Sequence, residues 1–519
     1  MTSSSKSFPI ALAIGALVVA VLTVLVVLIR AGGDPSDAAN WLVQWELRSS
    51  DNGPLFQFMQ DLVAGRPLDW VFSPQVYVFP ELPISALAFA VTGGNVYGYY
   101  LAVAVLNNAL LYLALLGLVR VLFPLASSAE SAVRAGIATV PLLLLPLVGT
   151  SWIFSFQLAP TYYFGMYLAL ISAPILLLTR SRGVRLTLAV ALAVTAASNP
   201  LTLLFAAPGT AVALALLLLR QGWRIALRPG VGIAAVLAFS LGFRLLFLPL
   251  QGTSPFTYAN PTVFAGRLSA ILPYYQYQAR DPAAAVILDL GVALSVVSLL
   301  AAAAAIIVFW RRRRDGRLLA VVYLGLVPLG GLAMTYAFMI THYLYFWPVL
   351  VLPLVLWPLA LPRVALRAAG GIGVAAFMVI ALATGIVAGN LTHLDRYFGY
   401  RNDETACIAS AVPNGSVGYA TFSDARRLSL TSAGRFRLLQ LQADAKPHTW
   451  LMNRATVRTE AGTFFYLNGS GDETQIDPNV LRRTFGDPDV VARCSDTQSV
   501  WLYTAAPKLK RIAEFYRVH

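Results

Sequence analysis

Long apolar runs separated by short polar connections make up most of the first 389 residues of the chain. A helix needs roughly 17–25 mostly apolar residues to cross a bilayer, so each run of about this length predicts one membrane span. About eleven such runs occur, at residues 8–30, 96–123, 132–149, 161–178, 186–198, 201–219, 231–248, 285–310, 318–339, 343–361 and 368–389. The pattern predicts a polytopic α-helical membrane domain over residues 1–389. Its first run is longer than the apolar core of a cleaved signal peptide and predicts an uncleaved span.

The first loop, residues 31–94, departs from this pattern. Its stretch GPLFQFMQDLVAG, residues 53–65, has apolar side chains at the spacing of an amphipathic helix, which we expect to lie on the membrane surface. Asp51 precedes this helix and Pro54 falls in its first turn, so Asp51 is also a candidate helix cap. Residues 86–91 are apolar but too short to span, and they predict an interfacial or re-entrant segment.

From about residue 390 the chain changes to short alternating stretches between Gly, Asn and Asp turns. Residues 417–422, 435–441, 463–469 and 499–505 have the pattern of strands, and residues 477–486 that of a helix. Roughly 130 residues are enough for one small domain. We therefore predict a soluble C-terminal domain over residues 390–519, with an α/β or α+β fold.

Composition supports a membrane protein rather than a soluble enzyme. The 519 residues are 58% hydrophobic and only 12% charged, with a mean hydropathy of +0.69, whereas a soluble domain carries about 25% charged residues. Alternate loops, with Lys6, hold 16 of the basic residues, and the opposite loops hold 5. Because basic loops stay in the cytoplasm, we predict a membrane protein with its N-terminus inside. The first loop and the C-terminal domain are then outside.

Both cysteines of the chain, Cys407 and Cys494, lie in the C-terminal domain. The predicted topology places them in an oxidising compartment, where disulfides persist. We therefore favour a disulfide between them over two unrelated buried thiols.

The layout and three short motifs resemble the GT-C superfamily of membrane glycosyltransferases. SDNGPLFQFMQDLVAGRP, residues 50–67, is similar to the family's acid followed by an amphipathic helix. FSPQVYVFPELPI, residues 72–84, looks like its proline- and aromatic-rich approach to the next span. THYLYFWPVLVLPL, residues 341–354, resembles its late R-Y-x-x-x-x-P helix entry, with His342 in place of the arginine. The resemblance implies a bacterial plasma-membrane protein with a polyprenyl-phosphate-linked sugar donor and a catalytic carboxylate in the first outer loop.

The first loop carries seven acidic residues against two basic ones. Sugar transfer to an acceptor hydroxyl needs a base to remove the proton, and a carboxylate at the membrane surface can do so. Asp51 is the first candidate because it precedes the predicted surface helix. Glu81, held between two prolines, is the second, and Asp34 and Asp37, next to the first span, are the third.

The leaving group of such a reaction is a lipid phosphate, which basic side chains stabilise. Candidates near the predicted outer surface are Arg244, Arg267, Arg280 and His342. Arg244 is the most informative, because an arginine inside a membrane span is costly and is usually paired or functional. An ion pair with Asp289 of the following span and a contact with the donor phosphate explain it equally well.

Aromatic and amide side chains cluster in PYYQYQARD, residues 273–281, as Tyr274, Tyr275, Gln276 and Tyr277, and Tyr163 lies in another predicted outer loop. Such side chains suit stacking on a sugar and recognition of its hydroxyls. For any single tyrosine, the aromatic belt of a membrane protein is the better explanation.

Signatures of several other enzyme classes are missing from the sequence: a Walker loop, paired-cysteine zinc spacing and a G-x-S-x-G elbow. The sequence favours a glycosyltransferase that moves a hexose or pentose from a polyprenyl phosphate to an extracytoplasmic glycan, lipid or protein. A divalent cation, Mg²⁺ or Mn²⁺, is left open as a cofactor, and nucleic acid is not expected as a partner. The alternatives are a transporter or flippase for a lipid-linked glycan, and a non-catalytic membrane scaffold. Acids gathered in one outer loop rather than at the bilayer midplane favour the enzyme.

Overall fold

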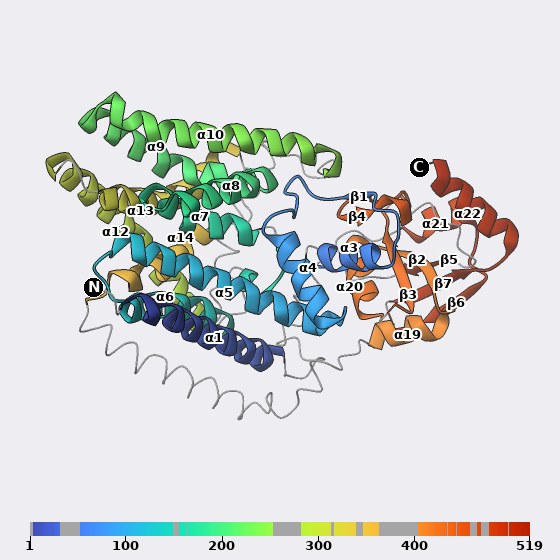
Figure 1. The fold of residues 1–519 in the computed structure, drawn as a ribbon. Helices are drawn as coiled ribbons and strands as arrows, with labels where there is room; N and C mark the ends of the chain where they lie inside the picture. Colours follow the sequence, from blue (N-terminus) through green and yellow to red (C-terminus); the bar gives the residue numbers. More distant parts are fainter. Residues whose placement is uncertain are drawn as a thin grey trace.

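A long helical bundle and a smaller mixed-sheet domain make up the structure, with part of the first loop packed between them (Figure 1). The computed structural model describes residues 4–31, 52–148, 155–161, 163–252, 282–312, 316–338, 346–362, 403–432, 434–442, 444–456, 464–468, 477–496 and 498–518. All structural statements below concern these residues.

The helices of the bundle follow the predicted apolar runs closely. They are α1 (Ser4–Ala31), α5 (Val96–Leu122), α6 (Ser128–Val148), α7 (Tyr163–Leu178), α8 (Arg182–Ser198), α9 (Leu201–Gln221), α10 (Trp223–Phe247), α12 (Pro282–Arg312) and α13 (Gly316–Phe338). Six described helices are long and apolar enough to cross a membrane: α1, α5, α6, α9, α10 and α12. The chain is therefore a mostly helical, multi-span membrane protein, and the full count of about eleven spans stays a prediction.

Helix α5 lies at the centre of the bundle core. It packs against α1, α6 and α7, and buried residues such as Leu111 and Leu115 extend along its length. Helix α10, in contrast, presents large apolar side chains outward, among them Phe239 and Leu241. A helix that is apolar on its outer surface suits contact with lipid acyl chains.

The predicted span at residues 343–361 is interrupted by prolines. Its described part forms the short helices α14 (Trp347–Leu350) and α15 (Leu352–Leu356) and the 3-10 helix η5 (Trp357–Ala360). A proline stands in the first turn of each piece, and proline lacks the N–H that would continue the preceding helix. An unbroken helix is therefore not formed here. The predicted span at residues 368–389 lies outside the described residues.

The C-terminal domain is built on a five-stranded mixed sheet with the order β3-β2-β5-β7-β6. Its strands are β2 (Ser416–Ala420), β3 (Phe436–Gln440), β5 (Phe464–Asn468), β6 (Val490–Arg493) and β7 (Ser499–Tyr503). β2 pairs in parallel with β3 and β5, whereas β7 pairs antiparallel with β5 and β6. Four strands and helix α21 (Pro478–Phe485) match predicted segments, and β6 has no counterpart among them.

Helices cover both faces of this sheet. Tyr419 of β2 packs in a cluster with α21 and α22 (Ala506–Val518), whereas the next residue, Ala420, packs with α19 (Asp403–Ala411) and α20 (Phe422–Thr431). Successive residues of a strand point to opposite faces, and burial of both faces is typical of α/β proteins. The predicted α/β character of the domain is confirmed for the described residues.

Cys407 of α19 and Cys494, which follows β6, form a disulfide, with their Cα atoms 5.6 Å apart. The bridge ties a helix to the edge strand of the sheet across 87 residues of sequence. The predicted pairing is confirmed.

The described part of the first loop, residues 52–94, forms three elements between the bundle and the C-terminal domain. These are α3 (Pro54–Val63), the two-residue strand β1 (Trp70–Val71) and α4 (Glu81–Thr92). β1 pairs antiparallel with β4 (Met452–Asn453) of the C-terminal domain, and α3 packs against α4 (Figure 1). At 12 residues, α4 is too short to cross a membrane, as predicted.

Helix α3 is the predicted amphipathic helix. Leu55 and Phe56 are buried in hydrophobic clusters with neighbouring elements, and Met59 is buried as well, so this part of the apolar side faces protein. Leu62 and Val63, at the end of the helix, are 50% and 75% exposed, so contact of the helix with the membrane surface stays a prediction. The N-cap position is Gly53, which makes no side-chain cap bond. Asp51, the predicted cap, lies outside the described residues, so its role at this helix start stays a prediction.

Cysteine labelling tests the predicted orientation. We expect K510C on α22, exposed in the C-terminal domain, to react with a membrane-impermeant maleimide in intact cells. R224C, exposed at the opposite end of the bundle at the start of α10, should react only after lysis. This orientation is predicted because one set of alternate loops holds 16 basic residues and the opposite set holds 5. A reversed labelling pattern would refute the predicted orientation.

Candidate functional site

Asp61, near the end of α3, is a buried acid with 1% of its surface exposed. Its carboxylate accepts hydrogen bonds from Trp70 Nε1 at 3.0 Å and from Asn453 Nδ2 at 2.9 Å. Arg437 of β3 donates two more, through Nη1 at 2.9 Å and Nη2 at 3.2 Å, and Arg66 lies at 3.3 Å. The negative charge is compensated by groups of the loop and the C-terminal domain, which makes Asp61 a structural centre rather than a free base.

Asp69 is another acid of the first loop, and an arginine neutralises its charge. Arg454 of the C-terminal domain contacts it at 2.5 Å, in a pair that is 44% and 38% exposed. Directly beside this pair, Trp70 of β1 stands opposite Asn453 of β4. The first loop is thus bound to the C-terminal domain by a strand pair flanked by two ion pairs.

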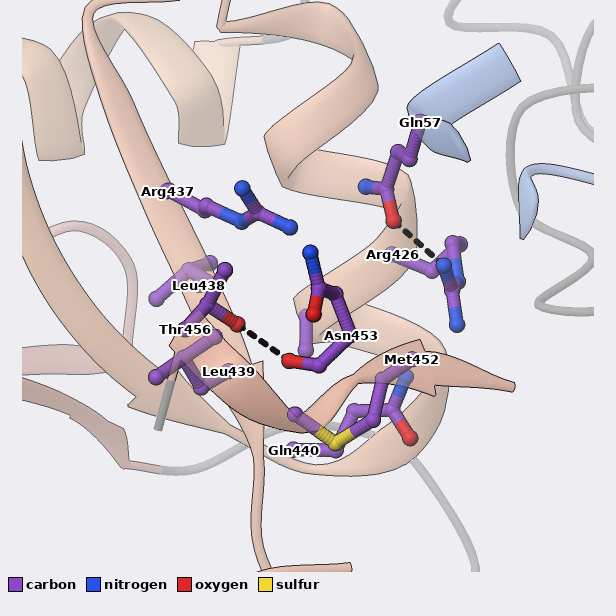
Figure 2. A pocket seen from close by; sticks show the side chains of 10 residues that line it. Gln57, Arg426, Arg437, Leu438, Leu439, Gln440, Met452, Asn453 and Thr456 are labelled. Atoms are coloured by element: carbon purple, nitrogen blue, oxygen red, sulfur yellow. Dashed lines mark hydrogen bonds between the residues drawn. The ribbon is translucent and has the colours of Figure 1, made fainter. Parts of the chain in front are cut away.

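A small pocket lies at this junction (Figure 2). Figure 2 shows Gln57 of α3 pointing toward Arg426 of α20, which donates a hydrogen bond to it, with Arg437 and Asn453 beside them. The free space inside is about 10 Å³, close to what a single water molecule needs. The pocket is too small to hold a sugar, so it belongs to the packing of the junction.

Beyond β1 the first loop continues onto the end of the bundle that faces the C-terminal domain. Phe72 donates its N–H to Leu250 O at 2.6 Å, and its carbonyl accepts from Gly252 N–H at 2.8 Å. A Cβ at residue 252 would come within 2.7 Å of a β1 side chain, so this close approach requires glycine. Further along, Phe79 donates its N–H to Ser198 Oγ at 3.1 Å, at the end of α8.

Glu81 begins α4 and is only 4% exposed. Its Oε1 accepts a hydrogen bond from the N–H of Gly165, at the start of α7, at 2.8 Å. A Cβ at residue 165 would collide with Pro80 and approach this oxygen to 2.8 Å, so glycine is needed here too. Unlike Asp61 and Asp69, Glu81 has no cationic partner among the described residues.

Burial raises the pKa of Glu81 to about 7, and the hydrogen bond from Gly165 opposes that rise. Desolvation disfavours the charged form of a carboxyl group, whereas a donor to the carboxylate favours it. A carboxyl with a pKa near neutrality is well suited to accept a proton in a reaction at neutral pH.

Arg244 lies in the last turn of α10 and contacts the end of α8, where Ser198 binds Phe79, two residues before Glu81. Its Nη1 donates to Ala197 O at 3.1 Å, and its Nη2 donates to Gln251 Oε1 at 2.8 Å. Asp289 is not among the contacts of Arg244 in the described part of the chain. The ion pair that offered a structural explanation for this arginine is not formed.

The remaining predicted site residues fall outside the described residues, with one exception. This applies to the acids Asp34, Asp37 and Asp51, to the basic residues Arg267, Arg280 and His342, and to Tyr274, Tyr275, Gln276 and Tyr277. Their roles stay predictions. Within the described ranges, no three His, Cys, Asp or Glu side chains come together as a metal site, and the divalent cation left open by the sequence stays a prediction.

Tyr163 is the exception, and it is buried in the bundle core at the start of α7. An aromatic cluster lies in the same core: Trp347 stacks on Tyr167 with ring centroids 3.9 Å apart, and Phe156 packs edge-on against both. These rings form part of the core, and a sugar-binding role for Tyr163 stays a prediction.

Three residues that position the site carry little signal in the sequence: Gly165, Ser198 and Gln251. Gly165 and Glu81 are 84 positions apart, and Ser198 and Phe79 are 119 positions apart. Hydropathy patterns report the face of a single helix and contain no information on such pairs. The glycine at the start of an apolar helix is the one local hint of a close approach.

No family model matches the sequence, and no curated protein matches it significantly. Among solved structures, the chain is similar to ArnT from Cupriavidus metallidurans in the apo state, with 14% identity and a TM-score of 0.43. That match covers 90% of this chain and 96% of the other. The same protein bound to undecaprenyl phosphate matches with 13% identity and a TM-score of 0.45, covering 97% and 99% of the two chains. At these values the likeness is one of general layout and carries no conclusion about the site.

Proposed function

We propose that this chain is an integral membrane glycosyltransferase. It transfers a sugar from a polyprenyl-phosphate-linked donor to an extracytoplasmic glycan, lipid or protein, with a carboxylate of the first loop as the general base. The observation that carries the proposal is Glu81, which is buried beside the end of the bundle and has a backbone N–H rather than a cation as its described partner. A buried, uncompensated carboxyl of this kind is costly, and such groups cluster at functional sites.

The proposed chemistry assigns one step to the carboxylate. The acceptor oxygen forms a bond to the anomeric carbon of the sugar while the bond from that carbon to the phosphate oxygen breaks. The acceptor proton passes to Glu81, and polyprenyl phosphate leaves with the bonding electron pair. A positioned base typically contributes about 10²–10⁴-fold to the rate of such a step.

Arg244 is suited to the phosphate of the donor. Its guanidinium has two described contacts, both to neutral oxygens, and guanidinium groups bind phosphate through paired hydrogen bonds. The adjacent Leu245 and Leu246 are 66% and 68% exposed on the apolar surface of α10. A lipid-borne phosphate could therefore reach Arg244 while its polyprenyl chain stays in contact with this surface.

Asp51, Asp34 and Asp37 remain candidate bases from the sequence. Glu81 moves ahead of them because its burial and its contact with α7 are described, whereas their surroundings are not.

Replacement of Arg244 by glutamine tests the phosphate contact. Hydrogen bonds to charged groups contribute about 1.5–3 kcal/mol, so R244Q should weaken the binding of polyprenyl phosphate on the order of 10- to 100-fold. Binding can be measured by titrating the purified protein in nanodiscs with the lipid phosphate.

The matched control is R224Q, which removes an exposed arginine at the other end of the same helix and should leave binding unchanged. Equal affinity of R244Q and wild type for polyprenyl phosphate would remove Arg244 from the site.

A further inference from the structure

We infer that the ion pair between buried Asp61 and Arg437, whose side chain is 21% exposed, is a positioning pair, through which the C-terminal domain holds both Glu81 and Arg244 in place. The inference rests on the proposed function, because it assigns catalytic consequences to contacts remote from the reacting atoms. It predicts that a substitution of Arg437, on the sheet of the C-terminal domain, slows sugar transfer although this residue contacts neither substrate.

The anchor of this arrangement is the carboxylate of Asp61, which receives donors from two parts of the chain. Trp70 belongs to the loop, whereas Arg437 and Asn453 belong to the C-terminal domain and lie 376 and 392 positions away in the sequence. With 1% exposure, the carboxylate is shielded from water, so solvent screening weakens these contacts little. A hydrophobic cluster adjoins it, with Trp70 and Phe72 from the loop and Trp450 from the domain.

One path of described contacts leads from this anchor to Arg244. β1 pairs with β4 of the C-terminal domain, and Phe72 directly after β1 exchanges backbone hydrogen bonds with Leu250 and Gly252. Between those two residues lies Gln251, whose Oε1 accepts the hydrogen bond from Arg244 Nη2. The guanidinium is thus oriented by a residue that the first loop holds in register.

A second path leads from the same anchor to Glu81. Tyr77 packs in the cluster with Trp70 and Phe72, and two residues later Phe79 is bound to Ser198 of α8. Glu81 follows and meets the N–H of Gly165. The segment between β1 and α4 is therefore fixed to the C-terminal domain at one end and to the bundle at the other.

Loss of the ion pair between Asp61 and Arg437 should loosen the segment between β1 and α4. It should not unfold the bundle, because the hydrophobic core of the bundle does not include this pair. A shift of about 1 Å in a catalytic group can cost about 10²-fold in rate. The expected signature is a fall in kcat with little change in KM for the acceptor, since neither Asp61 nor Arg437 contacts it in the proposed reaction.

The test compares R437Q with R454Q in the full-length protein in nanodiscs. Both variants remove an arginine that pairs with an acid of the first loop, but the Arg454–Asp69 pair is the more exposed, and exposed pairs contribute little. Hydrogen exchange is followed by mass spectrometry at four amides with described hydrogen bonds: those of Phe72, Phe79, Gly165 and Gly252.

We expect R437Q to accelerate exchange at these four amides and to lower kcat by about 10- to 100-fold. R454Q should leave both the exchange rates and kcat unchanged. R437K keeps the positive charge, so it should recover most of the kcat that R437Q loses. Unchanged exchange at all four amides in folded R437Q would overturn the inference. So would a lowered melting temperature with an unchanged kcat, which is the signature of a merely structural pair.

The exchange measurement does not depend on sugar transfer. If the wild-type protein transfers no sugar, the proposed function fails, while faster exchange at the four amides in R437Q would still support the mechanical link. If the wild type is active and exchange is unaffected, the link fails and the proposed function stands. Should R437Q not fold, D61N replaces it, because this substitution disrupts the same pair from the loop side.

Discussion

Replacing Glu81 by glutamine should lower the rate of sugar transfer by about 10²–10⁴-fold while the protein stays folded. Glutamine has nearly the same shape, and its side-chain oxygen can still accept the hydrogen bond from the N–H of Gly165. It cannot accept the acceptor's proton at neutral pH. The measurement is the initial rate of transfer by purified protein in vesicles, with the melting temperature recorded as a check on folding.

The pH dependence of the wild-type rate belongs to the same prediction. Burial raises the pKa of Glu81 to about 7, so the ionised form that acts as base is lost as the pH falls below this value. The rate should therefore rise with pH through about 7. The same pKa shift acts on folding stability in the opposite direction. Because the pKa of Glu81 is higher in the folded protein than in the unfolded chain, protonated Glu81 favours the folded state at low pH. This contribution to stability is lost as the pH rises through about 7.

Asp69→Asn is the matched control, because it also changes an acid of the first loop to its amide. Asp69 is partly exposed and paired with Arg454, so its loss should change the rate by less than about twofold. If E81Q transfers sugar at a normal rate, Glu81 is not the base. The assignment then moves to Asp51, or to Asp34 and Asp37, and D51N becomes the next variant to measure.

Removing the disulfide should have the largest effect on stability. Replacing Cys407 and Cys494 together by serine opens a loop closed across 87 residues. On the chain-entropy model this costs about 4–5 kcal/mol of stability in the C-terminal domain. We expect a clear drop in the temperature at which this domain becomes sensitive to protease in the full-length variant.

The bridge itself can be checked by mass mapping of the native protein without reductant, which should yield one cross-linked peptide pair. Two thiols that react with an alkylating reagent in the native protein would contradict the structure. They would also weaken the predicted placement of the domain outside the cytoplasm.

Local patterns were enough to predict most elements. The strands β2, β3, β5 and β7 lie in stretches of alternating or aromatic residues, and the bundle helices lie in long apolar runs. β6 carries a weaker signal, because it is four residues long and Val490 and Val491 are both exposed. Its place in the sheet depends on pairing with β7, which a local pattern does not contain.

Helix α3 shows that a correct pattern does not say what an apolar face contacts. The spacing of Leu55, Phe56 and Met59 predicts an apolar face, and that face exists. The pattern cannot tell whether it meets lipid or protein, since both environments favour the same side chains. The interrupted span at residues 343–361 is a different case, because its regularly spaced prolines are visible in the sequence and outweigh its hydropathy.

The candidate site was predicted only in part, because local sequence patterns do not report contacts between residues that lie far apart in the chain. Glu81 and Arg244 stand out in the sequence as an acid between prolines and an arginine in an apolar run. Their partners Gly165 and Gln251 do not, and neither does the pair of Asp61 with Arg437, 376 positions away. These contacts arise when the first loop is held between two domains, and that arrangement is a property of the tertiary fold.

The central claim is that this protein breaks the bond between a sugar and polyprenyl phosphate, and one measurement tests it most directly. Purified protein in vesicles is supplied with polyprenyl-phosphate sugars and with lipid and glycan acceptors, and the lipids are analysed by mass spectrometry. Our account predicts free polyprenyl phosphate and glycosylated acceptor in equal amounts with the wild type, and their formation about 10²–10⁴-fold more slowly with E81Q. Transfer of the intact donor from one leaflet to the other, with no bond broken, would contradict it and identify a flippase instead.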